Sequence, residues 1–114
     1  MTALAAQSGV IVVNGIVGYA GLRASVAALA AGNRLALANK ESMVAGGPLL
    51  EEALRSGSGE IIPVDSEHSA LFQLLAGHDR SAVRRLVLSA SGGPFRGMSA
   101  EQVAAATPES ALRH

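Results

Sequence analysis

Two carboxylates that could bind a metal ion follow an apolar run in the middle of the chain. Ile61–Val64 has the composition of a short buried strand, and Asp65, Ser66, Glu67 and His68 come directly after it. Residues i and i+2 of an extended segment point to the same side, so Asp65 and Glu67 could coordinate one hard cation. In the alternative interpretation, Asp65 caps a helix and Glu67 lies in its first turn, where the helix dipole favours an acid.

Two other polar segments also follow expected strands. Asn39-Lys40-Glu41-Ser42 comes after the strand expected at 34–38, and Ser91-Gly92-Gly93 comes at the end of the strand expected at 83–91. In a doubly wound parallel sheet, such loops meet at the edge formed by the carboxyl ends of the strands. A lysine, an acid pair and a glycine-rich serine loop would together suit an anionic ligand that chelates a metal ion.

Each of these groups also has an ordinary structural explanation. Asn39 is a good helix N-cap with Glu41 in the first turn, and Lys40 alone could be a solvated residue at a helix start. The Ser91 segment could be a simple glycine turn, and His114 could be a frayed terminus. The spacing leaves these alternatives open.

The elements that must position these residues form an alternating pattern. A β-branched run at 9–15 and the run at 34–38 predict strands, with a helix between them that opens at Gly18 and Gly21 and ends at Gly32-Asn33. A second helix is expected from about 39 to 55, with a kink or restart at Gly46-Gly47-Pro48. Further elements are a helix at 69–75, a strand at 83–91, and short helices capped by Ser99 and Thr107. The pattern predicts an α/β fold with part of a doubly wound, Rossmann-like parallel sheet.

Composition narrows the classes of partner. Among 114 residues, 49% are apolar and 16% charged, which predicts a buried core. Nine basic and nine acidic residues balance, so no nucleic-acid partner is expected. The apolar run at 10–22 is too short and too interrupted to span a bilayer, so no membrane partner is expected either. The chain has no cysteine, which is compatible with a cytoplasmic location.

Three longer strings carry a family resemblance. Ala38–Ser42, Pro63–His68 and Ser91–Arg96, in this order and at these separations, resemble the 1-deoxy-D-xylulose 5-phosphate reductoisomerase family. The resemblance implies an enzyme that uses NADPH and Mg²⁺ or Mn²⁺ to convert 1-deoxy-D-xylulose 5-phosphate to 2-C-methyl-D-erythritol 4-phosphate, in non-mevalonate isoprenoid biosynthesis. It also implies that the full-length protein is a homodimer and that its partner is a small sugar phosphate.

The resemblance assigns roles to individual residues. Asp65 and Glu67 match metal ligands, and Glu67 also matches a residue that touches substrate. Lys40 matches a catalytic lysine beside the substrate oxygens. Substrate contacts are implied for Ser66 and for Ser91, which matches a serine of the phosphate pocket, and cofactor contacts are implied for Asn39 and Glu41. His114, outside the three strings, falls where the family has a substrate-contacting histidine at the start of a flexible loop.

The chain departs from the family pattern at both ends. It has no glycine-rich NADPH loop, and the family's third metal carboxylate and helical carboxyl-terminal domain would lie beyond His114. We therefore expect an internal fragment, with residues 1–57 closing an NADPH-binding domain and residues 58–114 opening an α+β catalytic domain. Such a fragment is expected to be inactive and to expose an unpaired sheet edge and an apolar face. The alternative is a free-standing, non-catalytic α/β module that binds a phosphorylated ligand through the Ser91 segment.

Overall fold

Three parallel strands lie at the centre of the first part of the chain in the computed structural model, which describes residues 1–87 and 92–113. The strands are β1 (Ile11–Asn14), β2 (Arg34–Leu37) and β3 (Glu60–Pro63), in the order β1-β2-β3. Their register pairs Val12 with Leu35 and Leu35 with Ile61. The predicted α/β architecture with a parallel sheet is confirmed.

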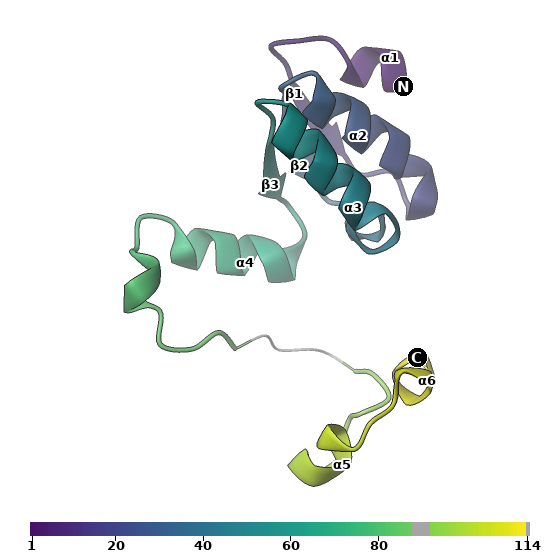
Figure 1. Cartoon of the computed structure of the whole chain (residues 1–114), viewed down its shortest axis with the longest axis vertical. Helices are drawn as coiled ribbons and strands as arrows, with labels where there is room; N and C mark the ends of the chain where they lie inside the picture. The colour runs from purple at the N-terminus through teal and green to yellow at the C-terminus, as the bar shows by residue number, and fades with distance from the viewer. Residues whose placement is uncertain (88–91, 114) are drawn as a thin grey trace. The chain divides into compact units, whose positions relative to one another are not determined.

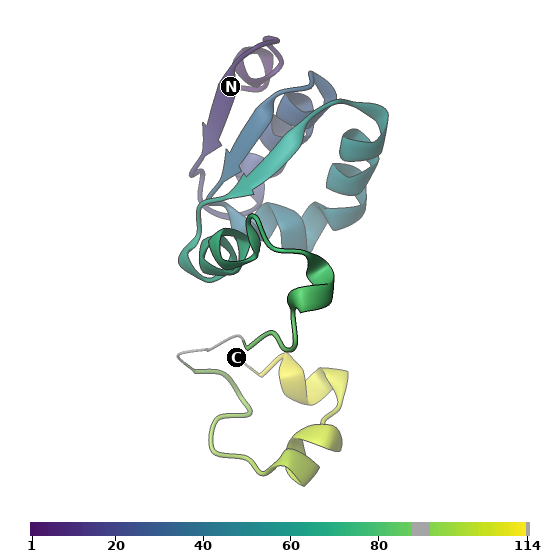
Figure 2. The same cartoon turned by 90° about the vertical axis from the view of Figure 1, so that its left-hand side faces the viewer.

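Two helices cover one face of this sheet (Figures 1 and 2). α2 (Leu22–Ala30) connects β1 to β2, and α3 (Lys40–Ser56) connects β2 to β3. Leu29 of α2, Leu35 of β2 and Leu50 of α3 are all fully buried and form the centre of the core. The apolar positions recognised in the sequence therefore pack between the sheet and the helical layer.

The opposite face of β1 is not covered by any described residue. Ile11 and Val13 point away from α2 and are 64% and 72% exposed. The β-branched run of β1 is typical of a strand covered on both faces of a parallel sheet, but in the described part of the chain only one face is covered. Among the described residues β1 pairs only with β2, which leaves the expected open edge, and Ile11 and Val13 form the expected apolar face.

The predicted break in α3 is observed. Gly46 has non-helical dihedral angles, φ −134° and ψ 25°, two residues before Pro48. A Cβ atom at Gly46 would lie 2.5 Å from Cδ1 of Leu22, so the missing side chain lets α3 approach α2 closely. The kink thus lies where the two helices pack together, and it relieves the backbone conflict that proline causes inside a helix.

α4 (Ser66–Leu75) begins earlier than the helix predicted at 69–75. Ser66 and Glu67 are therefore helical, and the expectation that Asp65 and Glu67 lie in one extended segment is wrong. The chain also has a short amino-terminal helix, α1 (Thr2–Ala5), and two single turns of 3₁₀ helix, η1 (Gly18–Gly21) and η2 (Arg80–Ala82).

Residues Met1–Val83 form one compact unit, and Arg84–His114 form a second. The first unit continues past the domain boundary proposed at residue 57, because β3 belongs to its sheet. In the second unit, α5 (Ala100–Ala104) and α6 (Pro108–Ala111) start at Ser99 and Thr107, and both have the capping box geometry. These caps confirm the predicted helix starts.

The strand predicted at 83–91 is wrong over residues 83–87, which have no regular secondary structure. Leu86 and Val87 are 59% and 71% exposed, and no described strand pairs with them. A β-branched run needs a neighbouring strand to satisfy its backbone groups, and composition alone does not supply one. Residues 88–91 of that expected strand lie outside the described residues.

Candidate metal and substrate site

The carboxyl ends of the three strands adjoin one another. The backbone N–H of Val64 donates to the carbonyl oxygen of Leu37 over 2.9 Å, and the N–H of Asn39 donates to the carbonyl of Asn14 over 3.1 Å. These bonds place the segment after β3 beside the segment after β2. The predicted convergence is therefore observed for the Asn39 and Asp65 segments.

Asp65 is the N-cap of α4. Its Oδ1 atom accepts hydrogen bonds from the backbone N–H of His68 over 3.1 Å and from Nδ1 of His68 over 2.6 Å. Burial disfavours the ionised carboxyl group, but the His68 hydrogen bonds and the charges of His68 and Lys40 outweigh it and lower the pKa of Asp65. The capping interpretation of Asp65 is confirmed, and the carboxylate is negatively charged at neutral pH.

Glu67 lies in the first turn of α4 and is exposed. Its own backbone N–H, the Ser66 hydroxyl at 2.9 Å and the charge of Lys40 lower the pKa of Glu67, while the charge of Asp65 acts against them. The two carboxylates are therefore close enough to repel each other. A divalent cation that accepts an oxygen from each would relieve this repulsion.

Lys40 is the exposed first residue of α3. Its positive charge lowers the pKa of both Asp65 and Glu67 from the neighbouring strand end. A basic group thus lies at the same end of the sheet as two acidic groups, although none of the described ion pairs includes Lys40. This arrangement can hold a ligand that carries oxygen atoms for a metal ion and negative charge for a lysine.

Asn39 is a fully buried N-cap whose amide is already paired. Its Oδ1 accepts from the backbone N–H of Ser42 over 3.0 Å, and its Nδ2 donates to the carbonyl oxygens of Ile16 and Gly18. The same Nδ2 donates to a carboxylate oxygen of Glu41 over 3.1 Å. Asn39 therefore joins the loop after β1 to the start of α3 and orients Glu41.

A second buried amide, Asn14, was missed by the sequence interpretation. Its Nδ2 donates to Ser25 Oγ over 2.7 Å and to the Gly21 carbonyl over 2.9 Å, and its Oδ1 accepts from the N–H of Ile16. The feature of the sequence that could have identified Asn14 is its position as the one polar residue at the carboxyl end of an apolar strand. Asn14 and Asn39 together fix the loop that lies beside Lys40.

Two predicted site residues, Ser91 and His114, lie outside the described residues. Within the described parts of the chain, no group of three or more His, Cys, Asp or Glu residues is placed to hold a metal ion. Asp65 and Glu67 therefore supply hard oxygen ligands that suit Mg²⁺ or Mn²⁺, but they form only part of a coordination sphere.

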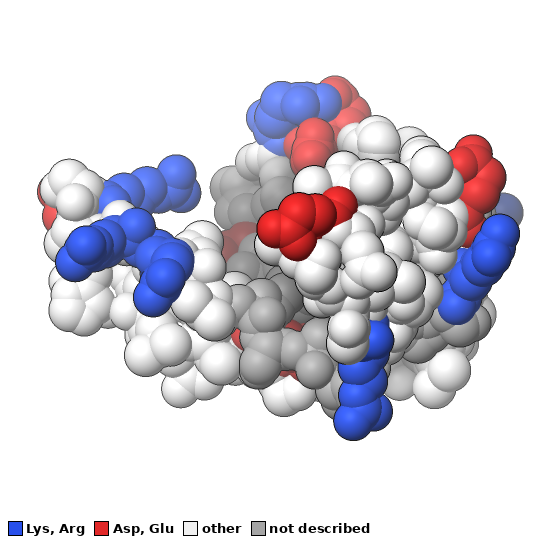
Figure 3. Space-filling model, turned by 90° about the horizontal axis from the view of Figure 1, so that it is seen from below, with Lys and Arg blue, Asp and Glu red and all other residues white. Residues whose placement is uncertain are grey.

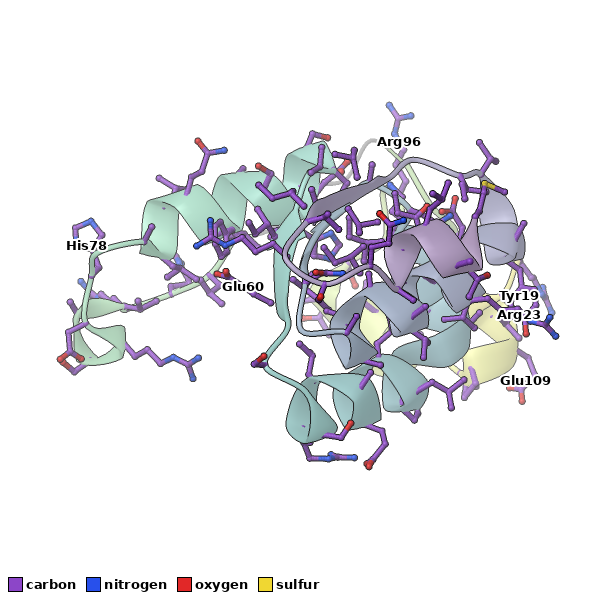
Figure 4. The ribbon with its side chains drawn as sticks, turned by 90° about the horizontal axis from the view of Figure 1, so that it is seen from above. Tyr19, Arg23, Glu60, His78, Arg96 and Glu109 are labelled. Carbon is purple, nitrogen blue, oxygen red and sulfur yellow. The ribbon has the colours of Figure 1, made fainter. Side chains whose placement is uncertain are left out.

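The surface carries charges of both signs. Both Lys and Arg side chains and Asp and Glu side chains appear on the face in Figure 3. At the amino ends of β2 and β3, Arg34 and Glu60 form an exposed ion pair at 3.2 Å (Figure 4 labels Glu60).

None of the described helices combines the length and the apolar character of a membrane span.

Comparison with known proteins decides the family. Residues 1–47 match the model "1-deoxy-D-xylulose 5-phosphate reductoisomerase", and residues 61–114 match the model of the C-terminal domain of the same enzyme. The chain belongs to the 1-deoxy-D-xylulose 5-phosphate reductoisomerase family. The reductoisomerase of Kitasatospora griseola is 56% identical over 113 residues, covering 99% of the chain and 29% of the relative. That of Chlorobium limicola is 49% identical, with 99% and 30% coverage.

Solved reductoisomerase structures have the same fold. The enzyme of Zymomonas mobilis in complex with NADPH is 44% identical with a TM-score of 0.71, covering 99% of this chain and 30% of that one. A reductoisomerase in complex with NADPH, fosmidomycin and magnesium is 36% identical with a TM-score of 0.69, again with 99% and 30% coverage. The chain thus spans a little under a third of the length of its reductoisomerase relatives.

Proposed function

We propose that this chain is the part of an NADPH- and divalent-metal-dependent 1-deoxy-D-xylulose 5-phosphate reductoisomerase that contributes two metal carboxylates and a catalytic lysine. The whole protein would convert 1-deoxy-D-xylulose 5-phosphate to 2-C-methyl-D-erythritol 4-phosphate in isoprenoid biosynthesis. The observation that carries this proposal is the 2.9 Å hydrogen bond from the Val64 N–H to the Leu37 carbonyl, which places the segments bearing Lys40 and the acid pair at the same end of the sheet.

The acid pair would hold Mg²⁺ or Mn²⁺. Bound there, the cation would act as a Lewis acid on the ketone and hydroxyl oxygens of the substrate. The low pKa of Asp65 and of Glu67 keeps both ligands ionised at neutral pH without a proton having to leave first. The Ser66 hydroxyl, which now donates to Glu67, would turn to a substrate hydroxyl.

Lys40 would lie beside the substrate oxygens and bind them. Its ammonium can donate up to three hydrogen bonds, and it opposes the negative charge that develops when a carbon–carbon bond next to the ketone breaks. Glu41 would approach the nicotinamide-ribose end of NADPH, with Asn39 contributing through the buried hydrogen bonds that fix this turn. Ser91 and His114 would contact substrate, as the family resemblance implies.

We further propose residues 1–57 and 58–114 as parts of two domains of a cytoplasmic, homodimeric enzyme. The family-model matches at 1–47 and 61–114 support a division between residues 47 and 61. The isolated chain would be inactive, because it contributes only two of the metal-binding carboxylates and only part of the cofactor site.

The experiment is a chimera. The 113 aligned residues of the Kitasatospora griseola enzyme are replaced by this chain, and NADPH oxidation is measured with Mg²⁺ and 1-deoxy-D-xylulose 5-phosphate. We expect turnover in the chimera and none in the isolated chain. Asp65→Asn and Lys40→Met should each lower kcat by at least about a hundredfold, the loss typical of a missing group in electrostatic stabilisation.

Glu52→Gln is the matched control, because Glu52 is an exposed carboxylate of α3 that contacts only Arg55 among the described residues. It should leave kcat unchanged. A chimera that folds and binds NADPH but gives no turnover would contradict the proposal, and so would full activity of the Asp65→Asn chimera.

A further inference from the structure

Asp65 has to serve two purposes that compete for the same oxygen atoms. It caps α4, and in the proposed function it also binds a divalent cation. A carboxylate that capped the helix with both oxygens would be a poor ligand. Both hydrogen bonds of Asp65, however, end on Oδ1, one from the backbone N–H of His68 and one from its ring.

The direction of the ring hydrogen bond follows from the chemistry of the acceptor. An ionised carboxylate can only accept, so Nδ1 of His68 carries the proton and donates it over 2.6 Å. A charge-assisted bond of this length is among the stronger hydrogen bonds in proteins. The Asp65 side chain is only 12% exposed, whereas that of His68 is 60% exposed.

We propose that His68 is a positioning residue: its ring N–H anchors Oδ1 of Asp65 and so leaves Oδ2 oriented for a divalent cation. The inference rests on the proposed metal site. The backbone bond alone would still let the carboxylate turn about its last torsion, whereas two donors on one oxygen restrict that rotation. No other described group donates to Oδ2.

Glu67 lacks such an anchor. Besides its own backbone N–H, the Glu67 carboxylate has one hydrogen-bond donor among the described residues, the hydroxyl of the adjacent Ser66, and the residue is exposed. The two proposed ligands therefore differ in preorganisation. The Asp65 carboxylate is held in one orientation before the metal ion binds, whereas the Glu67 side chain can change its conformation. Loss of an outer hydrogen-bond partner of this kind typically lowers metal affinity by about 10- to 100-fold.

The test compares two replacements of His68 that both remove the imidazole. In His68→Asn, the amide nitrogen takes the place of Nδ1 and can still donate to Oδ1; in His68→Leu, a methyl group of similar position cannot. Mn²⁺ affinity of the 114-residue chain is measured by electron paramagnetic resonance. Broadening of backbone amide signals in the first turn of α4 locates the bound ion.

We expect Mn²⁺ affinity to fall at least about tenfold in His68→Leu and to stay within about threefold of wild type in His68→Asn. His78→Leu is the control for loss of a surface histidine, because His78 lies in the turn beyond the far end of α4 (Figure 4). This variant should leave the Mn²⁺ affinity unchanged. Equal affinities in wild type and His68→Leu would overturn the inference. Equal losses in His68→Leu and His68→Asn would also overturn it, because the ring itself and not its N–H would then matter.

Asp65→Asn separates failure of this inference from failure of the proposed function. If Asp65→Asn weakens Mn²⁺ binding and His68→Leu does not, the result supports the proposed metal site but refutes the positioning role of His68. If Asp65→Asn leaves Mn²⁺ affinity unchanged, the metal site itself is refuted, and the positioning role falls with it.

Discussion

The backbone N–H of Val64 donates a 2.9 Å hydrogen bond to the carbonyl oxygen of Leu37. This bond extends the pairing of β2 and β3 by one step beyond the strands. As a result, the residues that follow each strand, Lys40 on one side and Asp65 on the other, emerge from the same end of the sheet. The electrostatic coupling of the candidate site follows from this pairing.

Replacing Lys40 should raise the pKa of Asp65 and of Glu67. The Lys40 charge favours the ionised form of both carboxyl groups, so Lys40→Met removes one cause of their low pKa values. Carboxyl ¹³C chemical shifts followed through an acid titration report each pKa separately. Arg55→Met is the control, because Arg55 contacts Glu51 and Glu52 instead. Unchanged titration of both acids in Lys40→Met would show that the ammonium does not act on them.

Asp65→Asn and Asp65→Ala should differ in stability but not in metal binding. Asparagine caps a helix about as well as aspartate, whereas alanine loses the cap at a cost of about 1 kcal/mol. We therefore expect urea unfolding at neutral pH to show a smaller loss of stability for Asp65→Asn, which keeps the cap but lacks the ionised carboxylate, than for Asp65→Ala, which also loses the cap at a cost of about 1 kcal/mol. Both variants should lose Mn²⁺ binding. Equal stability of the two variants would argue against the observed cap.

Acid should remove the stabilisation that Asp65 provides. Its pKa is lower in the folded chain than the ordinary value of 3.8, so the folded state favours the ionised form. The resulting stabilisation is present above pH 3.8 and is lost as the pH falls through the lower, folded-state pKa. The free energy of unfolding of wild type should therefore decrease toward that of Asp65→Asn in urea titrations carried from neutral to acid pH. A difference between the two proteins that grows with acid would contradict the sign of this shift.

Gly46→Ala should destabilise the first unit. The added Cβ would lie 2.5 Å from Cδ1 and 2.6 Å from Cδ2 of Leu22, and forcing a methyl group into such a contact costs about 1–3 kcal/mol. Gly47→Ala is the matched control, since nothing lies within 4 Å of its added Cβ. It should be neutral or slightly stabilising in thermal unfolding. A neutral Gly46→Ala would mean that α2 and α3 are not packed as closely as described.

Val13→Lys should reduce self-association of the chain. Val13 is 72% exposed on the uncovered face of the edge strand β1, and a lysine there opposes pairing with another chain. Sedimentation velocity should show fewer large species with no loss of thermal stability. Val12→Lys is the contrasting variant: Val12 packs against the core, so its replacement should destabilise the fold.

The sequence alone determined the features that depend on neighbouring residues. The strand, helix and cap signals around Asn39, Ser99 and Thr107 predicted helix starts that the structure confirms, because capping is a local interaction between a side chain and the next turn. The break at Gly46-Gly47-Pro48 was likewise predictable from the missing proline N–H. The three motif strings also identified the family, and the comparisons bear it out.

Tertiary structure decided what depends on residues far apart in the chain. Spacing left Asp65 open between helix cap and metal ligand; the local contact with His68 shows the cap, which uses Oδ1 alone, whereas a metal site also needs groups from other segments that only the fold brings together. The run at 83–87 has strand composition but no strand partner among the described residues, since pairing is a long-range contact that composition does not specify. Only the alignment of β2 and β3 brought the start of α3, with Lys40, to the same end of the sheet as Asp65, which lies 25 residues further along the chain.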